Sequence, residues 1–214
     1  MSGWVAIVPL KPKGQRKTRL GTHLAADQRD RLADLLADHV TQVLSIVPRI
    51  GIVAILSSEQ PSAPHDRWIA DHGRGLNEEL AEARQKMKPA SSLVVHGDLP
   101  GLCAADVDAM LDGAERQGSA IAPDRHFTGT NALALADDRP FEYAFGTGSF
   151  ERHRASLGSE CGIVCRPGLG LDLDTTADLD FMLNILRSDA GSAAVWTREA
   201  SAKYVRAFAL PETP

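Results

Sequence analysis

The sequence predicts an α/β protein whose sheet is largely parallel and flanked by helices. Apolar runs of strand length alternate along the chain with segments that repeat apolar residues every three or four positions. Several apolar runs are continuous, which is typical of strands covered on both faces in a parallel sheet. With 214 residues, 43% of them hydrophobic, the chain can bury a core of ordinary size, and we expect one domain over 1–214.

The first half of the chain begins with a short β-rich run, residues 4–10, that ends at a basic loop. From Asp27, the expected N-cap of a helix, leucine and valine recur at three- and four-residue steps and form one apolar stripe. Residues 51–57 are continuously apolar and predict a second strand. Asn77 is expected to cap the next helix, because two glutamates follow it where the helix dipole favours carboxylates.

The second half repeats this alternation. Its strands are expected at 93–97, 119–123 and 131–136, with a short one at 162–165. A helix is predicted over about 105–117. A final helix is expected after Asp174, because Thr175 and Asp178 form a pair typical of a capping box and an apolar stripe follows them.

Composition excludes several classes of protein. The net charge of −5 and the isoelectric point near 5.8 do not give the basic surface that nucleic acids and anionic membranes attract. No apolar stretch approaches the ~20 residues of a membrane span. Cys103, Cys161 and Cys165 are too few for a disulfide framework, so we expect buried, unreactive thiols. These features predict a cytoplasmic protein without nucleic-acid or membrane partners.

Residues 188–214 form a carboxyl-terminal extension whose packing the pattern does not define. The extension contains three aromatic residues, Trp196, Tyr204 and Phe208. We expect it to pack either on the domain or on a second subunit, and the second case predicts a homodimer.

A basic loop follows the first predicted strand. Five cations fall within residues 11–19, and a glycine lies among them. Such a loop can surround a polyphosphate with side-chain and backbone donors, although the Walker A spacing is absent. The competing interpretation is a solvated surface loop of no special function.

Acidic residues follow two later strands. Asp98 comes at the end of the apolar run 93–97, and Asp172 and Asp174 share one face of an extended stretch. Carboxylates on one face repel each other unless a cation separates them, and Mg²⁺ prefers such oxygen ligands. The competing interpretations make Asp98 a turn residue that bonds nearby amides and make Asp174 a simple helix cap.

Two clusters of glycine, hydroxyl and amide groups complete the candidate features. They are Gly129-Thr130-Asn131 and Gly146-Thr147-Gly148-Ser149. Their donors suit a small anionic group such as a carboxylate or a phosphate. Plain turns are the competing interpretation.

Eight strings in these segments match one known family. They are Val8-Pro9-Leu10-Lys11, Lys17-Thr18-Arg19-Leu20, Gly75-Leu76-Asn77, Gly97-Asp98-Leu99-Pro100, Ala122-Pro123-Asp124-Arg125-His126, Thr128-Gly129-Thr130-Asn131-Ala132-Leu133, Phe145-Gly146-Thr147-Gly148-Ser149-Phe150 with His153, and Leu171-Asp172-Leu173-Asp174-Thr175. Through them the chain resembles the CofC/FbiD guanylyltransferases of coenzyme F420 biosynthesis over about residues 5–187.

The resemblance implies a fold and a reaction. The fold is a single-domain nucleotide-diphospho-sugar transferase (MobA-like) architecture. The reaction transfers GMP from GTP to the phosphate of a three-carbon acid, which is 2-phospho-L-lactate, phosphoenolpyruvate or 3-phospho-D-glycerate, and it releases pyrophosphate. Mg²⁺ is the implied cofactor, and the product passes to the transferase that acts on the deazaflavin Fo.

The resemblance also implies a role for individual residues. GTP contacts are implied for Pro9, Lys11, Lys17, Arg19, Gly75, Asn77 and Asp98, with Lys11, Lys17 and Arg19 as the catalytic cations. The implied acceptor residues are Thr130, Gly146 and Ser149. The implied metal ligands are Asp98, Asp172 and Asp174. Arg74 departs from the usual glycine-rich triplet, and it either meets an anionic group or merely occupies a loop.

Two alternatives to this function stay open on the sequence alone. One is a nucleotidyltransferase for a different, molybdopterin-like cofactor precursor. The other is a non-catalytic nucleotide-binding module, which would not need three carboxylates.

Overall fold

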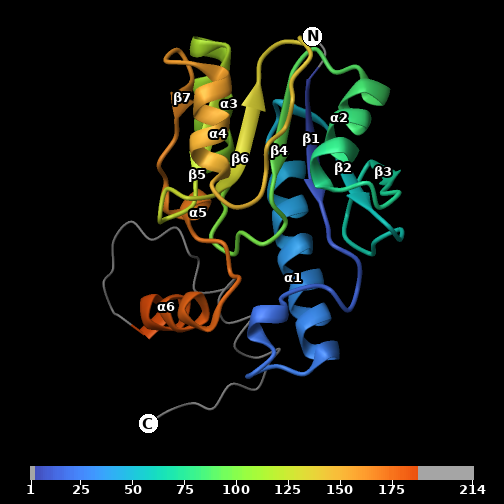
Figure 1. Ribbon diagram of the computed structural model, residues 1–214, viewed down its shortest axis with the longest axis vertical. Coiled ribbons are helices and arrows are strands. Elements are labelled where there is room, and N and C mark those ends of the chain that lie inside the picture. Colours follow the sequence, from blue (N-terminus) through green and yellow to red (C-terminus); the bar gives the residue numbers. More distant parts are fainter. Residues whose placement is uncertain (1–2, 188–214) are drawn as a thin grey trace.

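The protein is a three-layered α/β/α structure in the computed structural model, which describes residues 3–187 (Figure 1). The middle layer is one sheet of β1 (Trp4–Pro9), β2 (Ile50–Ser57), β3 (Arg67–Ala70), β4 (Ser92–Val95), β5 (Ser119–Pro123), β6 (Thr130–Leu135) and β7 (Gly162–Ile163). The helices are η1 (a 3-10 turn, Thr18–Leu20), α1 (Ala26–Ser45), α2 (Leu76–Met87), α3 (Ala104–Gln117), α4 (Ser149–Leu157), α5 (Pro167–Gly170) and α6 (Thr176–Arg187). The predicted extension, residues 188–214, lies outside the described residues.

The strand order is β3-β2-β1-β4-β6-β5-β7, and β6 alone runs against the other strands of this sheet. The predicted largely parallel sheet is therefore confirmed. Because β6 is reversed, its first residue, Thr130, pairs with Pro123 at the carboxyl end of β5. The start of β6 thus shares one edge of the sheet with the carboxyl ends of the other strands, and we call it the loop edge.

Helices cover both faces of the sheet. Ala6 and Val8 of β1 pack in one apolar cluster with α1 and α3, whereas Val5 and Ile7 pack in another with α2 and α4. This division follows from the alternation of side chains along a strand. Because both faces are covered, the strands consist of continuous apolar residues, and burying that area stabilises the fold by about 25 cal/mol per Å².

A third cluster joins α6 to η1 and α1 beyond the loop edge (Figure 1). Its buried members are Leu20, Leu24, Leu32, Leu36, Leu171, Leu173, Leu179 and Met182. The predicted capping box of α6 is confirmed, because Asp178 Oδ2 accepts hydrogen bonds from Thr175 N at 2.6 Å and from Thr175 Oγ1 at 2.7 Å. The interpretation of Asp174 as the helix cap is therefore wrong.

Most predicted elements exist, with ends that differ by one or two residues. The strand 119–123 is confirmed with its bounds. Two predicted N-caps are wrong: α1 begins after Ala25, whose amide donates to Gln28 Oε1 at 2.9 Å, and α2 begins after Gly75. Asp27 and Asn77 instead lie inside the first turns of these helices.

The sequence did not predict β3 and α4. β3 is a four-residue strand at the edge of the sheet, and its first two side chains are exposed, so it lacks the apolar run of a central strand. α4 buries Ser149 and His153 beside Phe150. Because two of these inward residues are polar, the sequence of α4 lacks the apolar periodicity that predicts a helix.

The cysteine prediction is wrong for two of three thiols. Cys161 is buried as expected, but Cys103 is half-buried and Cys165 is exposed. β7 ends at Ile163, two residues before the predicted end, so Cys165 lies outside it. Among the described helices, none combines the length and the apolar character needed to cross a bilayer.

Candidate active site

The loops with the predicted site residues meet at the loop edge. Leu173 N donates a hydrogen bond to Asp98 O at 3.0 Å, so the loop before α6 lies against the loop after β4. Thr130 N donates to Ser149 Oγ at 2.9 Å, which joins the start of β6 to the start of α4. Pro9 ends β1 at this same edge. Ligands of α/β proteins collect there, as the sequence predicted.

The basic loop after β1 is folded back onto α1. Arg16 is buried, with its Nε donating to Lys11 O at 2.6 Å and its NH1 lying 2.5 Å from Asp34 Oδ1. Gly14 N donates to the carboxylate of Asp30 at 3.0 Å. The interpretation as a solvated surface loop is therefore wrong for Arg16 and Lys17, which are buried, whereas most other residues of the segment are exposed. Lys11 itself stays exposed and available to an anion.

Lys17 lies at the centre of an ion-pair cluster. Its Nζ is 2.7 Å from Asp98 Oδ2 and 3.7 Å from Asp174 Oδ1, and its side chain is 6% exposed. Arg19 NH1 lies 3.1 Å from Asp174 Oδ2 and adds a second cation. Lys17 has a φ of +50°, a conformation that costs a non-glycine residue on the order of 1 kcal/mol and clusters at functional sites. Asp98 lies in a turn, as its competing interpretation held, but its carboxylate binds a lysine and not the nearby amides.

Asp98 and Asp172 keep capacity for a further cation. Asp98 Oδ1 is buried and has no hydrogen-bond partner among the described residues. Burial pushes the pKa of Asp98 upward, but the charge and hydrogen bond of Lys17, together with the other nearby basic groups, outweigh burial and hold this pKa below its usual value. Burial, and then the negative charge of Asp98, raises the pKa of Asp172 to about 6. Asp172 Oδ1 accepts one hydrogen bond, from Asn131 Nδ2 at 3.3 Å.

The predicted metal site is not assembled as a set of three ligands. Over the part of the chain that the structure describes, no three His, Cys, Asp or Glu side chains are arranged to hold a metal ion. Asp174 is instead paired with Lys17 and Arg19. Asp98 and Asp172 still fit a hard cation such as Mg²⁺, because it would use the unpartnered oxygen of Asp98 and remove the repulsion between the two carboxylates.

The three predicted acceptor residues lie together at the start of α4. Ser149 N donates to Gly146 O at 3.0 Å, and Ser149 Oγ accepts from Thr130 N. Gly146 is exposed and has a φ of +114°, which favours glycine. Thr130 and Ser149 are 1% and 2% exposed. The backbone around Gly146 is thus the open part of this cradle, which we call the acceptor loop (residues 144–149).

His153 joins the acceptor loop to β6. Its Nε2 accepts a hydrogen bond from Ala144 N at 2.9 Å, and its Nδ1 lies 3.0 Å from Thr130 Oγ1. Because a backbone amide can only donate, the ring proton of neutral His153 belongs on Nδ1. Burial, and then the charge of Arg152, lowers the pKa of His153 to about 4.

Acidification is expected to destabilise the protein through His153. Since the pKa of His153 is about 4 in the folded chain and 6.5 is its ordinary value, its neutral form contributes stability fully above pH 6.5. That stability is lost as the pH falls from 6.5 through 4, by up to about 3 kcal/mol. Denaturant unfolding of wild type and His153→Gln across this range measures it, with exposed His72→Gln as the control. A stability gap that stays constant with pH would contradict the expectation.

The segment before α2 departs from its implied nucleotide contacts. Gly75 has a φ of +106° and is exposed at the N-cap of α2. The Asn77 amide bonds the backbone of Phe145: its Oδ1 accepts from Phe145 N at 2.8 Å, and its Nδ2 donates to Phe145 O at 3.2 Å. The side chain that the resemblance implies for GTP therefore contacts the acceptor loop.

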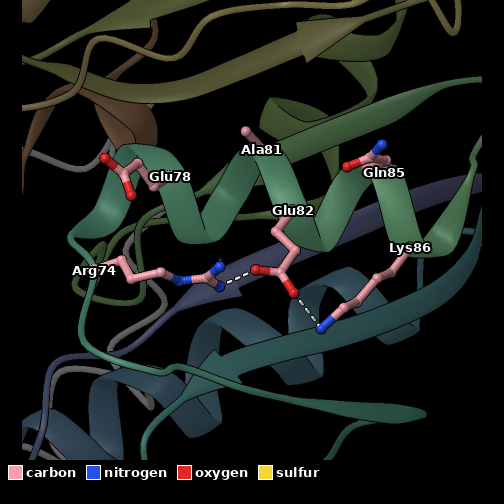
Figure 2. Close-up of a pocket in the computed structure, with 6 residues that line it drawn as sticks. All are labelled: Arg74, Glu78, Ala81, Glu82, Gln85 and Lys86. Carbon is pink, nitrogen blue, oxygen red and sulfur yellow. Dashed lines mark ion pairs between the residues drawn. The ribbon is translucent and has the colours of Figure 1, made fainter.

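Arg74 is ion-paired with α2. Its guanidinium pairs with Glu79 Oε2 at 2.9 Å and with Glu82. Figure 2 shows Arg74 and Lys86 both reaching Glu82 in a hollow of about 580 Å³ along α2. The cations of this hollow are thus paired with its own carboxylates.

Sequence reasoning did not predict the contacts through which three residues shape the site. Asn131 bonds Asp172, His153 fixes Thr130, and the Asp124 carboxylate accepts hydrogen bonds from the amides of Thr128 and Gly129 at 2.8 Å. Asn131 lay in a matched string, but its hydrogen bond to Asp172 joins residues 41 positions apart, and no local sequence pattern indicates such a contact.

The largely parallel α/β sheet, with lysine, arginine and aspartates at its loop edge, has the architecture of the nucleotide-diphospho-sugar transferase fold. Solved structures share the fold. One is described as a nucleotide-diphospho-sugar transferase from Desulfovibrio desulfuricans G20, with a TM-score of 0.71, 17% identity, and coverage of 97% of this chain and 99% of that one. Another is a nucleotidyl transferase from Methanothermobacter, with a TM-score of 0.60, 14% identity, and coverage of 86% and 97%.

The sequence places the chain more narrowly. The family model described as "Guanylyl transferase CofC like" matches residues 4–183, so the chain belongs to this family and is a nucleotidyltransferase. A phosphoenolpyruvate guanylyltransferase of Sphaerobacter thermophilus is 36% identical over 188 residues, which cover 82% of this chain and 90% of that protein. A protein of the same name from Chloroflexus aggregans is 35% identical, with coverage of 80% and 93%. The resemblance drawn from the matched strings is confirmed.

Proposed function

We propose that this protein is a GTP-dependent guanylyltransferase that transfers GMP to a phosphorylated three-carbon acid and releases pyrophosphate. The observation that carries the proposal is the cluster of Lys17, Arg19, Asp98 and Asp174, which lies at the same loop edge as the acceptor loop. Its cations suit the phosphates of GTP, and the exposed backbone at Gly146 suits a small anion. Membership of the guanylyl transferase family supports the same activity.

Phosphoenolpyruvate is the proposed acceptor. The names of the similar proteins favour it over 2-phospho-L-lactate and 3-phospho-D-glycerate. Coenzyme F420 biosynthesis is the proposed pathway, with the product passing to the Fo transferase.

The residues of the site act mainly by charge and position. An oxygen of the acceptor phosphate attacks the α-phosphorus of GTP, and the bond from that phosphorus to the pyrophosphate oxygen breaks. The attacking oxygen is already anionic, so no side chain has to remove a proton. Lys11, Lys17 and Arg19 neutralise the charge that grows on the leaving pyrophosphate.

Mg²⁺ is the proposed cofactor, with Asp98 and Asp172 as the residues that would hold it. When bound, it would supply a Lewis acid that neutralises phosphate oxygens. Asp174 contributes differently, because its carboxylate orients the cations of Lys17 and Arg19.

A substrate panel tests the proposal. Purified protein is incubated with Mg²⁺, one of four nucleoside triphosphates and one of the three phospho-acids, and pyrophosphate release is measured. Coupling to the Fo transferase removes the product as it forms. Turnover with GTP and phosphoenolpyruvate is expected. Turnover with CTP or ATP alone would favour another nucleotidyltransferase, and GTP binding without turnover on any acceptor would favour a binding module.

A further inference from the structure

Phe145 lies where the two halves of the site meet. Its backbone N and O are both bonded by the Asn77 amide, at 2.8 Å and 3.2 Å. Its ring centroid is 5.1 Å from that of His96, which precedes Asp98 by two residues. Gly146, the open residue of the acceptor loop, follows it directly. A displacement of Phe145 would therefore change both the packing of His96 near Asp98 and the position of Gly146.

The acceptor loop is tied to α4 at other points. His153 Nε2 accepts from Ala144 N at 2.9 Å, and Arg152 NH2 donates to Ala144 O at 2.8 Å. Arg152 NH1 also donates to Thr147 O. The ring of Phe145 packs on that of His153, with centroids 4.7 Å apart. These contacts hold the loop to its own helix, whereas the Asn77 amide holds it to α2, 68 positions earlier in the chain.

We propose that Asn77 is a positioning residue that holds the acceptor loop in place through Phe145. The inference rests on the proposed function, and it differs from the direct GTP contact that the resemblance implies. Both ends of the Asn77 amide bond the backbone of Phe145, so Asn77 fixes the residue that directly precedes Gly146. Loss of these two bonds lets the acceptor loop shift relative to α2, and acceptor binding then has to order it.

Steady-state kinetics of Asn77→Ala provide the first test. The KM for phosphoenolpyruvate is expected to rise about tenfold, because the two hydrogen bonds that hold Phe145 are lost. A tenfold change corresponds to about 1.4 kcal/mol. The KM for GTP is expected to change less than twofold. Gln85→Ala removes an exposed amide from the same helix, away from the acceptor loop, and serves as the matched control (Figure 2). A raised KM for GTP with an unchanged KM for phosphoenolpyruvate would overturn the inference.

Binding of the acceptor without turnover provides a second test. The Kd of phosphoenolpyruvate is measured by calorimetry in the presence of saturating α,β-methylene GTP. This Kd is expected to rise about tenfold in Asn77→Ala, while the Kd of α,β-methylene GTP alone is kept. An unchanged Kd for phosphoenolpyruvate would overturn the inference.

Failure of the proposed function has a separate signature. Wild-type protein that turns over no acceptor in the substrate panel would contradict the proposed function. Normal wild-type turnover with unchanged acceptor kinetics in Asn77→Ala would contradict the inference alone. Hydrogen exchange at the Phe145 amide in the free protein completes the set, because loss of the Asn77 acceptor is expected to speed it at least tenfold, and an unchanged rate would count against the positioning role.

Discussion

Asp172→Asn is expected to be more stable than the wild type at neutral pH and at least about a hundredfold less active. The pKa of Asp172 is raised to about 6 by burial and by the charge of Asp98, so its ionised form weakens the folded state. Replacing it with a neutral isostere removes that repulsion and stabilises the protein by on the order of 1–3 kcal/mol. Activity falls because the pair of carboxylates that fits the cation is broken.

The stability difference between Asp172→Asn and the wild type is expected to depend on pH. The gain in stability is complete above about pH 6. It fades as the pH falls from about 6 to 3.8, the ordinary pKa of an aspartate, because wild-type Asp172 is increasingly neutral over this range. Denaturant unfolding in the presence of EDTA between pH 4 and pH 7 measures the gain, and the substrate panel measures turnover. Asp180→Asn, an exposed change on α6, is the control. A destabilised variant, or one with full activity, would contradict the role given to Asp172.

Lys17→Met is expected to lower kcat/KM for GTP roughly ten- to hundredfold, because it removes a charge-assisted contact to phosphate. It is also expected to destabilise the fold. Lys17 Nζ lies between Asp98 and Asp174, and removing it leaves two carboxylates without their shared counter-charge. A loss of about 1–3 kcal/mol follows, since both carboxylates remain partly exposed to water.

The control for this change comes from the same loop. Lys13 is exposed, so Lys13→Met removes an equal charge without breaking the cluster. Thermal unfolding and GTP kinetics of both variants are compared at one ionic strength. Equal effects of the two substitutions on stability and on kcat/KM for GTP would contradict the role given to Lys17 in the ion-pair cluster.

The order of strands and helices was readable from the sequence because most strands are buried on both faces. Continuous apolar runs mark such strands, and turn residues punctuate them. β3 was not predicted because a strand at the end of the sheet is half solvated and lacks a continuous apolar run. α4 was not predicted because its inward face carries the polar residues Ser149 and His153. A polar residue in the core cannot be told from a surface residue until its partner is known.

The location of the site was also predictable, whereas its pairing was not. The basic loop and the aspartates were expected at one edge because the topology of an α/β sheet brings those segments there. Arg19 and Asp174 are 155 positions apart, and a 3.1 Å contact between them depends on the packing of both loops. For this reason the sequence suggested three carboxylates around a metal, and the structure has Asp174 paired with cations.

The small cluster under α6 links the local stability of the two charged loops. Leu20 of η1 directly follows the basic loop, Leu171 and Leu173 flank Asp172, and all three lie in this cluster, apart from the cores of the sheet. A sub-global opening of α6 would expose these leucines together and separate Lys17 and Arg19 from Asp174 in one step. The amides of η1 and α6 are therefore expected to exchange with deuterium as one cooperative unit, faster than those of β1 and β4.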